Sequence, residues 1–405
     1  MSDNNLKIKG RVTLRKGREY SAEQGHPWIF SGALDGRPQS LANEVLADGS
    51  VVEVQSSNSK TIGLGFYNSK TSIAVRLFSF GEHSSGKDPH SIILSLLEAA
   101  VTARERWLPA NVTCRRLINA EGDSLPGLIV DQYADHLVLQ ISTASMELCK
   151  TFIVEFLQSR TKATSIYERS DSASRLEEGL EPSVVQCFGI TPNEIIVQEG
   201  TMRLVVDVIE GQKTGFFIDQ REMRKFVAEV SNGKRVLNCF SYSGGFSVAA
   251  LIAGATRVVS VDSSESAIAT CAKNVAINNI DAGLHEGKCV NAFDYLGGTH
   301  ERFDLVILDP PAFAKQRDHV RNALKAYHQI NQSGFKLVNT GGLMITSSCS
   351  NFVSQNDFER EVLEVAVKSG RKVSIIGRHR HAIDHPVAAA HEQGAYLKSL
   401  ILLVN

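Results

Sequence analysis

Residues 235–262, RVLNCFSYSGGFSVAALIAGATRVVSVD, decide the fold of this chain. The apolar run RVLNC is followed by Gly244 and Gly245, then by a helical stretch, and a second apolar run ends at Asp262. Apolar strands that alternate with helices are typical of a parallel sheet covered on both faces. This stretch therefore predicts the first strand–helix–strand unit of a doubly wound α/β domain.

The same alternation continues to the end of the chain and predicts a seven-stranded sheet. The predicted strands are RVLNCF (235–240), RVVSVDS (257–263), KCVNAF (288–293), FDLVILDPP (303–311), GGLMITSSC (341–349), KVSIIGR (372–378) and YLKSLILLV (396–404). No helix is evident between the last two strands. We therefore expect a Rossmann-like domain of the methyltransferase type, in which the final strand enters antiparallel.

Two smaller segments precede this domain. Residues 1–80 contain short alternating runs separated by Gly and Asn-Ser turns, which predict a small antiparallel β-barrel or sandwich. Residues 88–186 combine two helical patterns with four strand candidates and predict an α+β module. The third segment, 187–405, opens with a predicted hairpin, EIIVQEGTMRLVVDVIE (194–210), that leads into the sheet.

Length and composition fit a division into three segments and indicate a globular protein. The chain has 405 residues, of which 43% are apolar and 21% charged, as in a globular protein of two or three domains. No apolar run reaches the roughly 18 residues of a membrane span, and MSDNNLKIKG at the start lacks the apolar core of a signal peptide. The seven cysteines follow neither disulfide nor zinc spacing. We therefore expect a cytoplasmic protein without a metal.

The net charge of −1 argues against a globally basic nucleic-acid binder, but residues 1–19 are locally basic. They contain Lys7, Lys9, Arg11, Arg15, Lys16 and Arg18. Such a strip can contact the phosphates of a nucleic acid, with Lys16 and Arg18 as the candidates. A solvated edge strand protected by charge explains the pattern equally well.

The strand ends nearest Gly244 predict a cofactor site. Glycines at a strand-to-helix turn let a ligand approach the backbone closely, but the segment is not GxGxxG, which disfavours a dinucleotide. A nucleoside without phosphates, such as S-adenosylmethionine, needs only one such approach. Asp262 would accept hydrogen bonds from ribose hydroxyls or cap the next helix, and one residue can have both roles. At the third strand end, Asn291 is the first candidate for the adenine edge and Asp294 the second.

A second pair of strand ends carries the predicted chemistry. Prolines cannot continue a central ladder, so at Asp309-Pro310-Pro311 the chain must leave the sheet. Asp309 and its neighbours would then bind the polar edge of a planar base, and Phe313 would stack on that base or belong to the core. Cys349 ends a neighbouring strand and is either a nucleophile or a small buried side chain.

A thiol at this position has a specific use. Carbon 5 of cytosine or uracil is not nucleophilic enough to accept a methyl group unaided, and a thiolate that adds at carbon 6 activates it. After transfer, a base removes the carbon 5 proton and the thiolate leaves. Cys349 beside Asp309 therefore predicts a pyrimidine carbon methyltransferase.

With DPPAF, SSCS, NCFSYSGGF and GQKTGFFIDQR assembled, the chain resembles the cytosine-5 methyltransferases of large-subunit (23S) ribosomal RNA. That family has a PUA domain, an EEHEE domain and a Rossmann methyltransferase domain. LRKGREYSAEQGHPWIFSGAL resembles the start of its PUA domain, and AEGDSLPGLIVDQYADHLVLQ resembles its EEHEE domain. The resemblance covers essentially the whole chain.

The resemblance implies roles for further residues. It places Lys213, Thr214, Gly215, Phe216, Asp219, Gln220 and Arg221 beside the methionine part of S-adenosylmethionine. It places Asn238, Phe240, Ser241 and Gly244 in the cofactor loop and Asp262 at the ribose. The predicted cofactor contacts also include Ser263, Asn291, Ala292 and Asp309. The RNA would meet Pro310, Pro311, Phe313, Lys16 and Arg18, with Cys349 as nucleophile and Asp309 between methyl donor and base. The family often has an acid where this chain has Asn291.

Other functions are also consistent with the sequence. Related DPPxF enzymes methylate a guanine nitrogen and need no cysteine, so Cys349 favours carbon methylation. A ribosome-assembly or RNA-binding protein without turnover is the alternative from another class, and an oxidoreductase is disfavoured by the missing phosphate-binding glycines. The sequence leaves open cytosine or uracil, the modified nucleotide, naked RNA or an assembling subunit, the base that takes the proton, and whether the protein is a homodimer.

Overall fold

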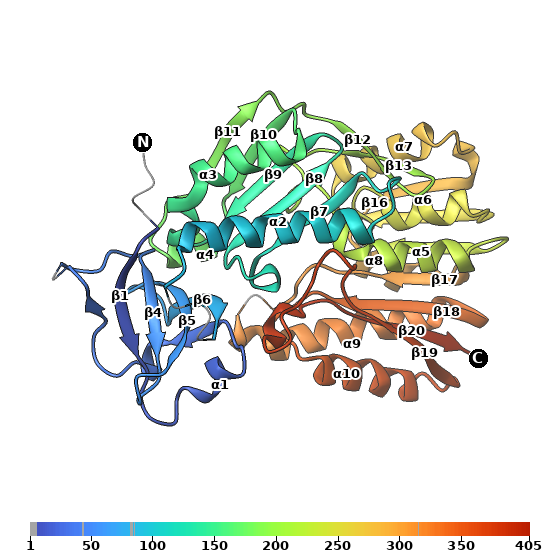
Figure 1. The fold of residues 1–405 in the computed structure, drawn as a ribbon. Coiled ribbons are helices and arrows are strands. Elements are labelled where there is room, and N and C mark those ends of the chain that lie inside the picture. Colours follow the sequence, from blue (N-terminus) through green and yellow to red (C-terminus); the bar gives the residue numbers. More distant parts are fainter. Residues whose placement is uncertain (1–5, 43, 82–83, 85, 315) are drawn as a thin grey trace. The chain divides into compact units, whose positions relative to one another are not determined.

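The computed structural model describes residues 6–42, 44–81, 84, 86–314 and 316–405. They form two compact units (Figure 1). The first comprises the described residues of Met1–Val197 together with Val206–Ile218 and Ile383–Gly394, and the second comprises Gln198–Val205, Asp219–Ala382 and Ala395–Asn405. The chain therefore crosses between the units several times.

The first unit begins with a six-stranded sheet of order β2-β6-β5-β4-β1-β3. Its strands are β1 (Ile8–Thr13), β2 (Trp28–Phe30), β3 (Gln39–Ser40), β4 (Val51–Gln55), β5 (Thr61–Tyr67) and β6 (Ile73–Phe80). The expectation of an entirely antiparallel arrangement is wrong, because β1 pairs with β4 in parallel. The edge-strand interpretation of the basic strip is wrong too, since β1 lies between β4 and β3.

A second sheet in the same unit has the order β11-β10-β9-β8-β7. Its strands are β7 (Cys114–Asn119), β8 (Leu128–Tyr133), β9 (His136–Ile141), β10 (Ser165–Ser170) and β11 (Ser183–Gly189). Helices α2 (Pro89–Trp107) and α3 (Ala144–Thr161) contribute apolar side chains to its core. Helix α2 begins where Asp88 accepts the Ser91 N–H and Pro89 occupies the first turn. Strands β2, β3 and β11 were not among those predicted.

The predicted hairpin joins the two units and consists of β12 (Ile195–Glu199) and β13 (Met202–Val206). The division of the chain at residues 80, 88 and 187 into three domains stays a prediction. Among the described residues, no helix is long and apolar enough to cross a membrane.

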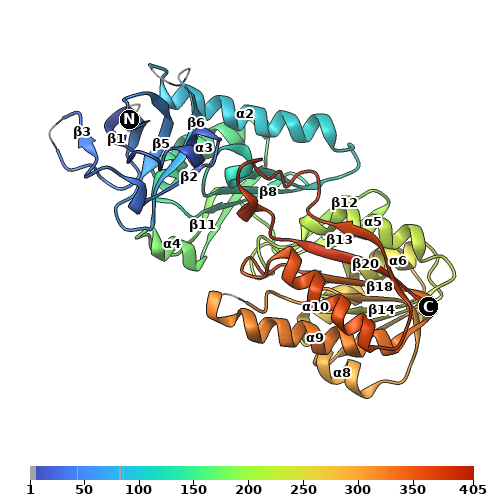
Figure 2. The same ribbon diagram turned by 90° about the horizontal axis from the view of Figure 1, so that it is seen from below.

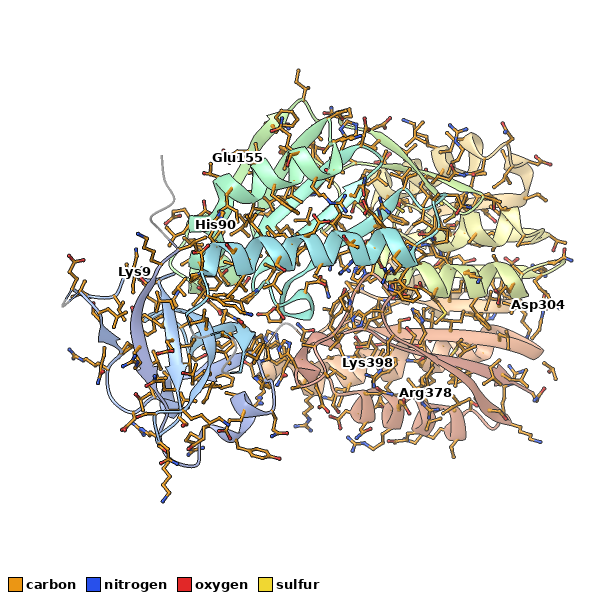
Figure 3. The ribbon with its side chains drawn as sticks, in the orientation of Figure 1. Lys9, His90, Glu155, Asp304, Arg378 and Lys398 are labelled. Atoms are coloured by element: carbon orange, nitrogen blue, oxygen red, sulfur yellow. The ribbon has the colours of Figure 1, made fainter. Side chains whose placement is uncertain are left out.

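The second unit contains the predicted seven-stranded sheet, with the order β16-β15-β14-β17-β18-β20-β19. The strands are β14 (Arg235–Cys239), β15 (Arg257–Asp262), β16 (His285–Cys289), β17 (Phe303–Leu308), β18 (Val338–Ser348), β19 (Val373–His379) and β20 (Lys398–Val404). Neighbours from β16 to β18 are parallel, and β20 is antiparallel to β18 and β19, as expected. Lys398, at the start of β20, is labelled in Figure 3.

Helices cover both faces of this sheet (Figure 2). Helices α8 (Ala292–Gly298), α9 (Val320–Leu337) and α10 (Gln355–Lys368) lie on one face and share a buried core with β14, β17 and β18. Helices α5 (Arg221–Val230), α6 (Gly245–Ile252) and α7 (Glu265–Ile277) lie on the other. One predicted element is misplaced. KCVNAF is not a strand throughout, because β16 ends at Cys289 and Ala292 begins α8.

Candidate active site

The carboxyl ends of the parallel strands bring the predicted residues to one edge of the sheet. Asp262 is the last residue of β15, Asp309 directly follows β17, and Cys349 directly follows β18. Strand β14 lies between β15 and β17, and β17 pairs with β18. The crevice outside the carboxyl ends is where open α/β sheets bind ligands.

Asp262 organises the loop that follows β14. One of its carboxylate oxygens accepts the Tyr242 N–H at 2.8 Å, and the other accepts the Ser264 N–H at 3.0 Å. The helix-cap interpretation of Asp262 is wrong, because Ser264 is the N-cap of α7 and accepts the Ala267 N–H. Each carboxylate oxygen has more than one lone pair, so these bonds leave Asp262 able to accept hydroxyl groups of a ligand.

Gly244 has a role that does not require a ligand. Its φ is +80°, in the left-handed region, and it directly precedes α6. A Cβ atom at this position would lie 2.1 Å from the Sγ atom of Cys271 in α7. Both the backbone conformation and the packing of α7 therefore demand glycine here.

The same loop offers buried polar atoms that suit a polar ligand. Asn238, fully buried in β14, donates its side-chain N–H to the Ser247 hydroxyl at 2.9 Å. Among the described residues, the Oδ1 atom of Asn238 and the hydroxyl groups of Ser241 and Ser243 have no hydrogen-bond partner. Leaving such a group unmatched costs about 1–3 kcal/mol. These groups and Asp262 fit the hydroxyl, amino and carboxylate groups of a nucleoside that carries an amino acid.

Other predicted cofactor contacts at this edge have structural partners. Asn291 is exposed and caps α8, since its Oδ1 atom accepts the Phe293 N–H at 2.8 Å. Ala292 is buried in the core, Ser263 is exposed, and Phe240 packs 6.2 Å from Phe293, centroid to centroid. The structure therefore gives Asn291 a capping role whether or not it also meets a ligand.

The carboxylate of Asp309 is held by Gln220, which belongs to the segment GQKTGFFIDQR (211–221). The Nε2 atom of Gln220 donates to both carboxylate oxygens of Asp309, at 3.0 and 3.1 Å. Gln220 is buried, and its Oε1 atom has no partner among the described residues. Arg221 instead lies beside Glu199, 3.6 Å away, which also pairs with Arg224. Gln220 thus fixes the orientation of the Asp309 carboxylate.

Lys213 and Thr214 belong to the first unit and differ in exposure. Thr214 is fully buried, donates to Asp131 at 2.5 Å and bonds to the Tyr133 hydroxyl at 2.8 Å. Arg116 neutralises Asp131 with two hydrogen bonds at 2.8 and 2.9 Å. Lys213 is exposed, and its ammonium lies 4.4 Å from the centre of the Phe217 ring. Thr214 therefore anchors the segment internally, whereas Lys213 faces outward.

Cys349 lies where the loops after β17 and β18 meet. Its Sγ atom is 3.8 Å from the carbonyl oxygen of Pro310. The hydroxyl of Ser350 accepts the Ala314 N–H at 3.2 Å, which ties the two loops together. Cys349 is only half-buried, so a substrate can reach a thiol at this position.

Four of the other six cysteines are less suited to nucleophilic chemistry. Burial raises the pKa of Cys149 to about 12 and that of Cys271 to about 11. It raises the pKa of the fully buried Cys239 further still. A thiol with such a pKa stays protonated near neutral pH, and the thiolate is the reactive form. Cys289 is exposed but ends β16, away from the Asp-Pro-Pro loop in the strand order.

The aromatic and proline residues near Asp309 divide between core and surface. Phe313 is half-buried and packs 4.9 Å from Tyr327 and 6.0 Å from Phe293, measured between ring centroids. Pro310 is buried and Pro311 is exposed. The core interpretation of Phe313 therefore accounts for its visible contacts.

Lys16 and Arg18 lie together in a turn after β1. Both side chains are exposed, and the Arg18 N–H donates to the carbonyl of Arg15 within this turn. Because both side chains project from an exposed turn, both can contact a phosphate.

Two residues near Cys349 were missed from sequence. The Tyr327 hydroxyl donates to Ser348 at 2.8 Å, and the Lys398 ammonium donates to the carbonyls of Ser350 and Val353, each at 2.7 Å. Tyr327 gave no sequence signal beyond its place on an amphipathic helix. Lys398 did, because it is the one charged residue in the predicted strand YLKSLILLV (396–404).

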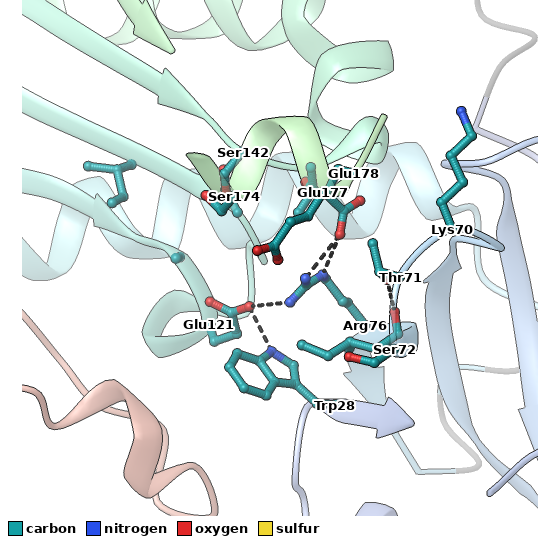
Figure 4. Close-up of a pocket in the computed structure, with 15 residues that line it drawn as sticks. Trp28, Lys70, Thr71, Ser72, Arg76, Glu121, Ser142, Ser174, Glu177 and Glu178 are labelled. Atoms are coloured by element: carbon teal, nitrogen blue, oxygen red, sulfur yellow. Dashed lines mark hydrogen bonds and ion pairs between the residues drawn. The ribbon is translucent and has the colours of Figure 1, made fainter. Parts of the chain in front are cut away.

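A cavity of about 520 Å³ lies within the first unit (Figure 4). Arg76 extends between Glu121 and Glu178, with nitrogen–oxygen distances of 3.4 and 3.0 Å, and the Trp28 indole donates to Glu121 at 2.8 Å. These contacts join the first sheet to the region of α4 (Ala173–Glu177).

Two family models and several known proteins match this chain. A model of the S-adenosylmethionine-dependent methyltransferase family matches residues 180–399, and a PUA-like domain model matches residues 12–80. The chain is 36% identical over 401 residues to Ribosomal RNA large subunit methyltransferase I of Aeromonas hydrophila, covering 98% of this chain and 99% of that one. It is 34% identical over 398 residues to the protein of that name from Escherichia coli K12, covering 96% and 98%.

A solved structure supports the fold independently. The crystal structure of SMU.776 complexed with SAH superposes with a TM-score of 0.83 at 23% identity and covers 98% of this chain and 100% of that one. At this level of identity the likeness concerns the fold.

Proposed function

Because the chain belongs to the S-adenosylmethionine-dependent methyltransferase family that includes the Ribosomal RNA large subunit methyltransferase I proteins, we propose that it methylates carbon 5 of a cytosine in 23S ribosomal RNA. The observation that carries this proposal is the half-buried thiol of Cys349 beside the Asp309-Pro310 loop, with Sγ 3.8 Å from the Pro310 carbonyl. The PUA-like segment and the names of the relatives support an RNA substrate.

The chemistry follows from the side chains at this edge. The Cys349 thiolate adds to carbon 6 of the pyrimidine, which makes carbon 5 nucleophilic. S-adenosylmethionine, when bound, supplies an electrophilic methyl group. Once carbon 5 carries the methyl group, loss of its proton restores the double bond and expels the thiolate. Asp309, whose carboxylate accepts a hydrogen bond from Gln220, would bind the polar edge of the base or take that proton.

We assign the cofactor to the loop after β14. Asp262 would bind the ribose, and the unmatched polar atoms of Asn238 and Ser241 would bind the amino acid part or ordered water that contacts it. By family resemblance, Lys213 and Gln220 would complete the methionine side. Lys16 and Arg18, both exposed, would hold RNA phosphates.

The test is transfer of labelled methyl groups to ribosomal RNA from a strain that lacks this protein. We expect the wild type and a Cys289→Ala control to label carbon 5 of one cytosine, and Cys349→Ala to label nothing. Cys289 is the control because it is exposed and ends a different strand, β16. Label on RNA treated with Cys349→Ala would mean nitrogen methylation and would refute the thiol mechanism.

A trapping experiment distinguishes chemistry from folding defects. RNA that carries 5-fluorocytidine cannot lose a proton from carbon 5, so the covalent adduct with Cys349 should persist through denaturing electrophoresis. No adduct with active wild-type enzyme would contradict the mechanism. Absence of any labelling by wild type would favour a non-catalytic RNA-binding role or a different substrate.

A further inference from the structure

Strand β20 places a charged residue at the catalytic edge of the sheet. Because β20 is antiparallel to β18, its first residue, Lys398, pairs with Ser348, the last residue of β18. A hydrogen bond of 2.8 Å between the hydroxyls of Ser347 and Ser399 supports the same register. Lys398 therefore lies beside the position where Cys349 leaves the sheet.

The environment of Lys398 is unusual for a lysine. The residue is only 6% exposed, and its ammonium donates to the carbonyls of Ser350 and Val353 at 2.7 Å each. Among the residues that the structure describes, no carboxylate lies within ion-pair distance of this ammonium. Lysines are almost never buried unless paired, so a buried ammonium bound only to neutral carbonyls needs a reason.

Both of those carbonyls belong to the segment that follows Cys349. Ser350 is the next residue, and Val353 is a fully buried residue of the same loop. On the other side, Tyr327 from α9 donates to the Ser348 hydroxyl. The residues on either side of Cys349 are thus held by a neutral side chain from α9 and by an ammonium group from β20.

Lys398, Asp309 and Tyr327 are the ionisable groups to consider around the Cys349 thiol. Burial lowers the pKa of Lys398 to about 8, while the negative charge of the Cys349 thiolate acts to raise it. Since attraction between two charges is mutual, the ammonium favours the thiolate to the same degree. A negative charge on Asp309, which directly follows β17, would act in the opposite direction. Burial raises the pKa of Tyr327 to about 12, so this side chain stays neutral.

We propose that Lys398 is a positioning residue for Cys349, whose ammonium holds the 350–353 segment in place and stabilises the thiolate form of the nucleophile. This inference deepens the proposed function and rests on it for its purpose, because a thiolate is needed to attack carbon 6. The interaction itself exists in the protein without RNA and can be measured there.

The test is the pH dependence of alkylation of the full-length protein by iodoacetamide, followed at individual cysteines by peptide mass spectrometry. Only the thiolate displaces iodide, so the midpoint of the rate profile reports thiolate formation. We expect Lys398→Met and Lys398→Gln to move the midpoint of Cys349 upward by about one pH unit, which is about tenfold in rate below the midpoint. Lys398→Arg, which retains a charge, should restore most of the difference.

Controls separate the charge from general damage. The exposed Cys289 in the same sample should keep its profile, and Lys368→Met, which removes an exposed lysine paired with Glu364, should change neither cysteine. Lys398→Gln keeps hydrogen-bond donors for the carbonyls, so it remains informative if Lys398→Met fails to fold. An unchanged Cys349 midpoint in a folded, neutral Lys398 variant would overturn the proposal.

The outcome is independent of the proposed function. If the midpoint shifts but wild type makes no 5-methylcytosine, Lys398 acts on the thiol and the assigned reaction is wrong. If 5-methylcytosine forms through Cys349 and the midpoint does not shift, the reaction stands and Lys398 is only a structural contact.

Discussion

The glycine that precedes α6 allows a quantitative test of how this edge is built. Gly244→Ala introduces two separate penalties. A φ of +80° places an alanine in the left-handed region, which costs about 1–2 kcal/mol. The new Cβ would lie 2.1 Å from the Sγ atom of Cys271, and overpacking of this kind costs about 1–3 kcal/mol.

The sum predicts a loss of about 2–5 kcal/mol in the unfolding free energy of the second unit. Cys271→Ala removes the Sγ atom and leaves its own Cβ at 3.0 Å, a distance that small shifts can relieve. The double variant should therefore recover the packing part of the loss but not the backbone part. We expect a coupling energy of about 1–3 kcal/mol between the two positions.

Amide hydrogen exchange of peptides from β14 and β15 is the appropriate assay, because both tryptophans, Trp28 and Trp107, lie in the first unit and do not report on this sheet. Additivity of the two substitutions within about 0.5 kcal/mol would refute the packing argument. So would an alanine variant of unchanged stability that has lost only its affinity for S-adenosylmethionine, since glycine would then serve ligand approach.

Three further predictions concern other parts of the chain. Thr214→Val removes the hydroxyl bound to Asp131 and should lower the stability of the first unit by about 1–3 kcal/mol, measured by tryptophan fluorescence in urea; no change would mean that water replaces the hydroxyl. Burial lowers the pKa of His379 to about 4. Between about pH 6.5 and 4, the unfolded chain therefore binds a proton at this residue that the folded chain does not bind, and the unfolding free energy should fall as the pH drops through this range. His379→Asn should flatten this dependence, and an equally steep profile in that variant would exclude His379 as its source. Charge reversal at Lys16 and Arg18 should weaken RNA binding and reduce its salt dependence, and an unchanged slope in filter binding would place the RNA elsewhere.

The interior of the second unit could be predicted because its strands are buried on both faces. Val236, Leu237 and Val306 are fully buried, and such continuous apolar runs leave a strong sequence pattern. The edge strand β16, HEGKC, has no buried residue and therefore no such pattern, which is why the strand was predicted a few residues late. The polar end of that stretch, Asn291, proved to be a helix cap.

Pairing and partners were harder to predict than elements. Alternation of apolar residues predicted β1 and β4 but says nothing of their relative direction, and they pair in parallel. The Lys-Thr-Gly segment was assigned from resemblance alone. Only the structure shows that Thr214 is fully buried against Asp131 while Lys213 is exposed, since that distinction depends on a strand about eighty residues earlier in the chain.

The placement of Lys398 illustrates why topology, and not composition, determines what surrounds the nucleophile. In a wholly parallel sheet, the first residue of every strand lies at the edge opposite the carboxyl ends, so a lysine that begins a strand would be far from Cys349. Reversal of β20 brings its first residue to the end of β18, where Lys398 pairs with Ser348. The antiparallel strand thus supplies a buried cation at the carboxyl edge from the body of the sheet. A residue on regular structure holds its position more rigidly than one on a loop, as thiolate stabilisation requires.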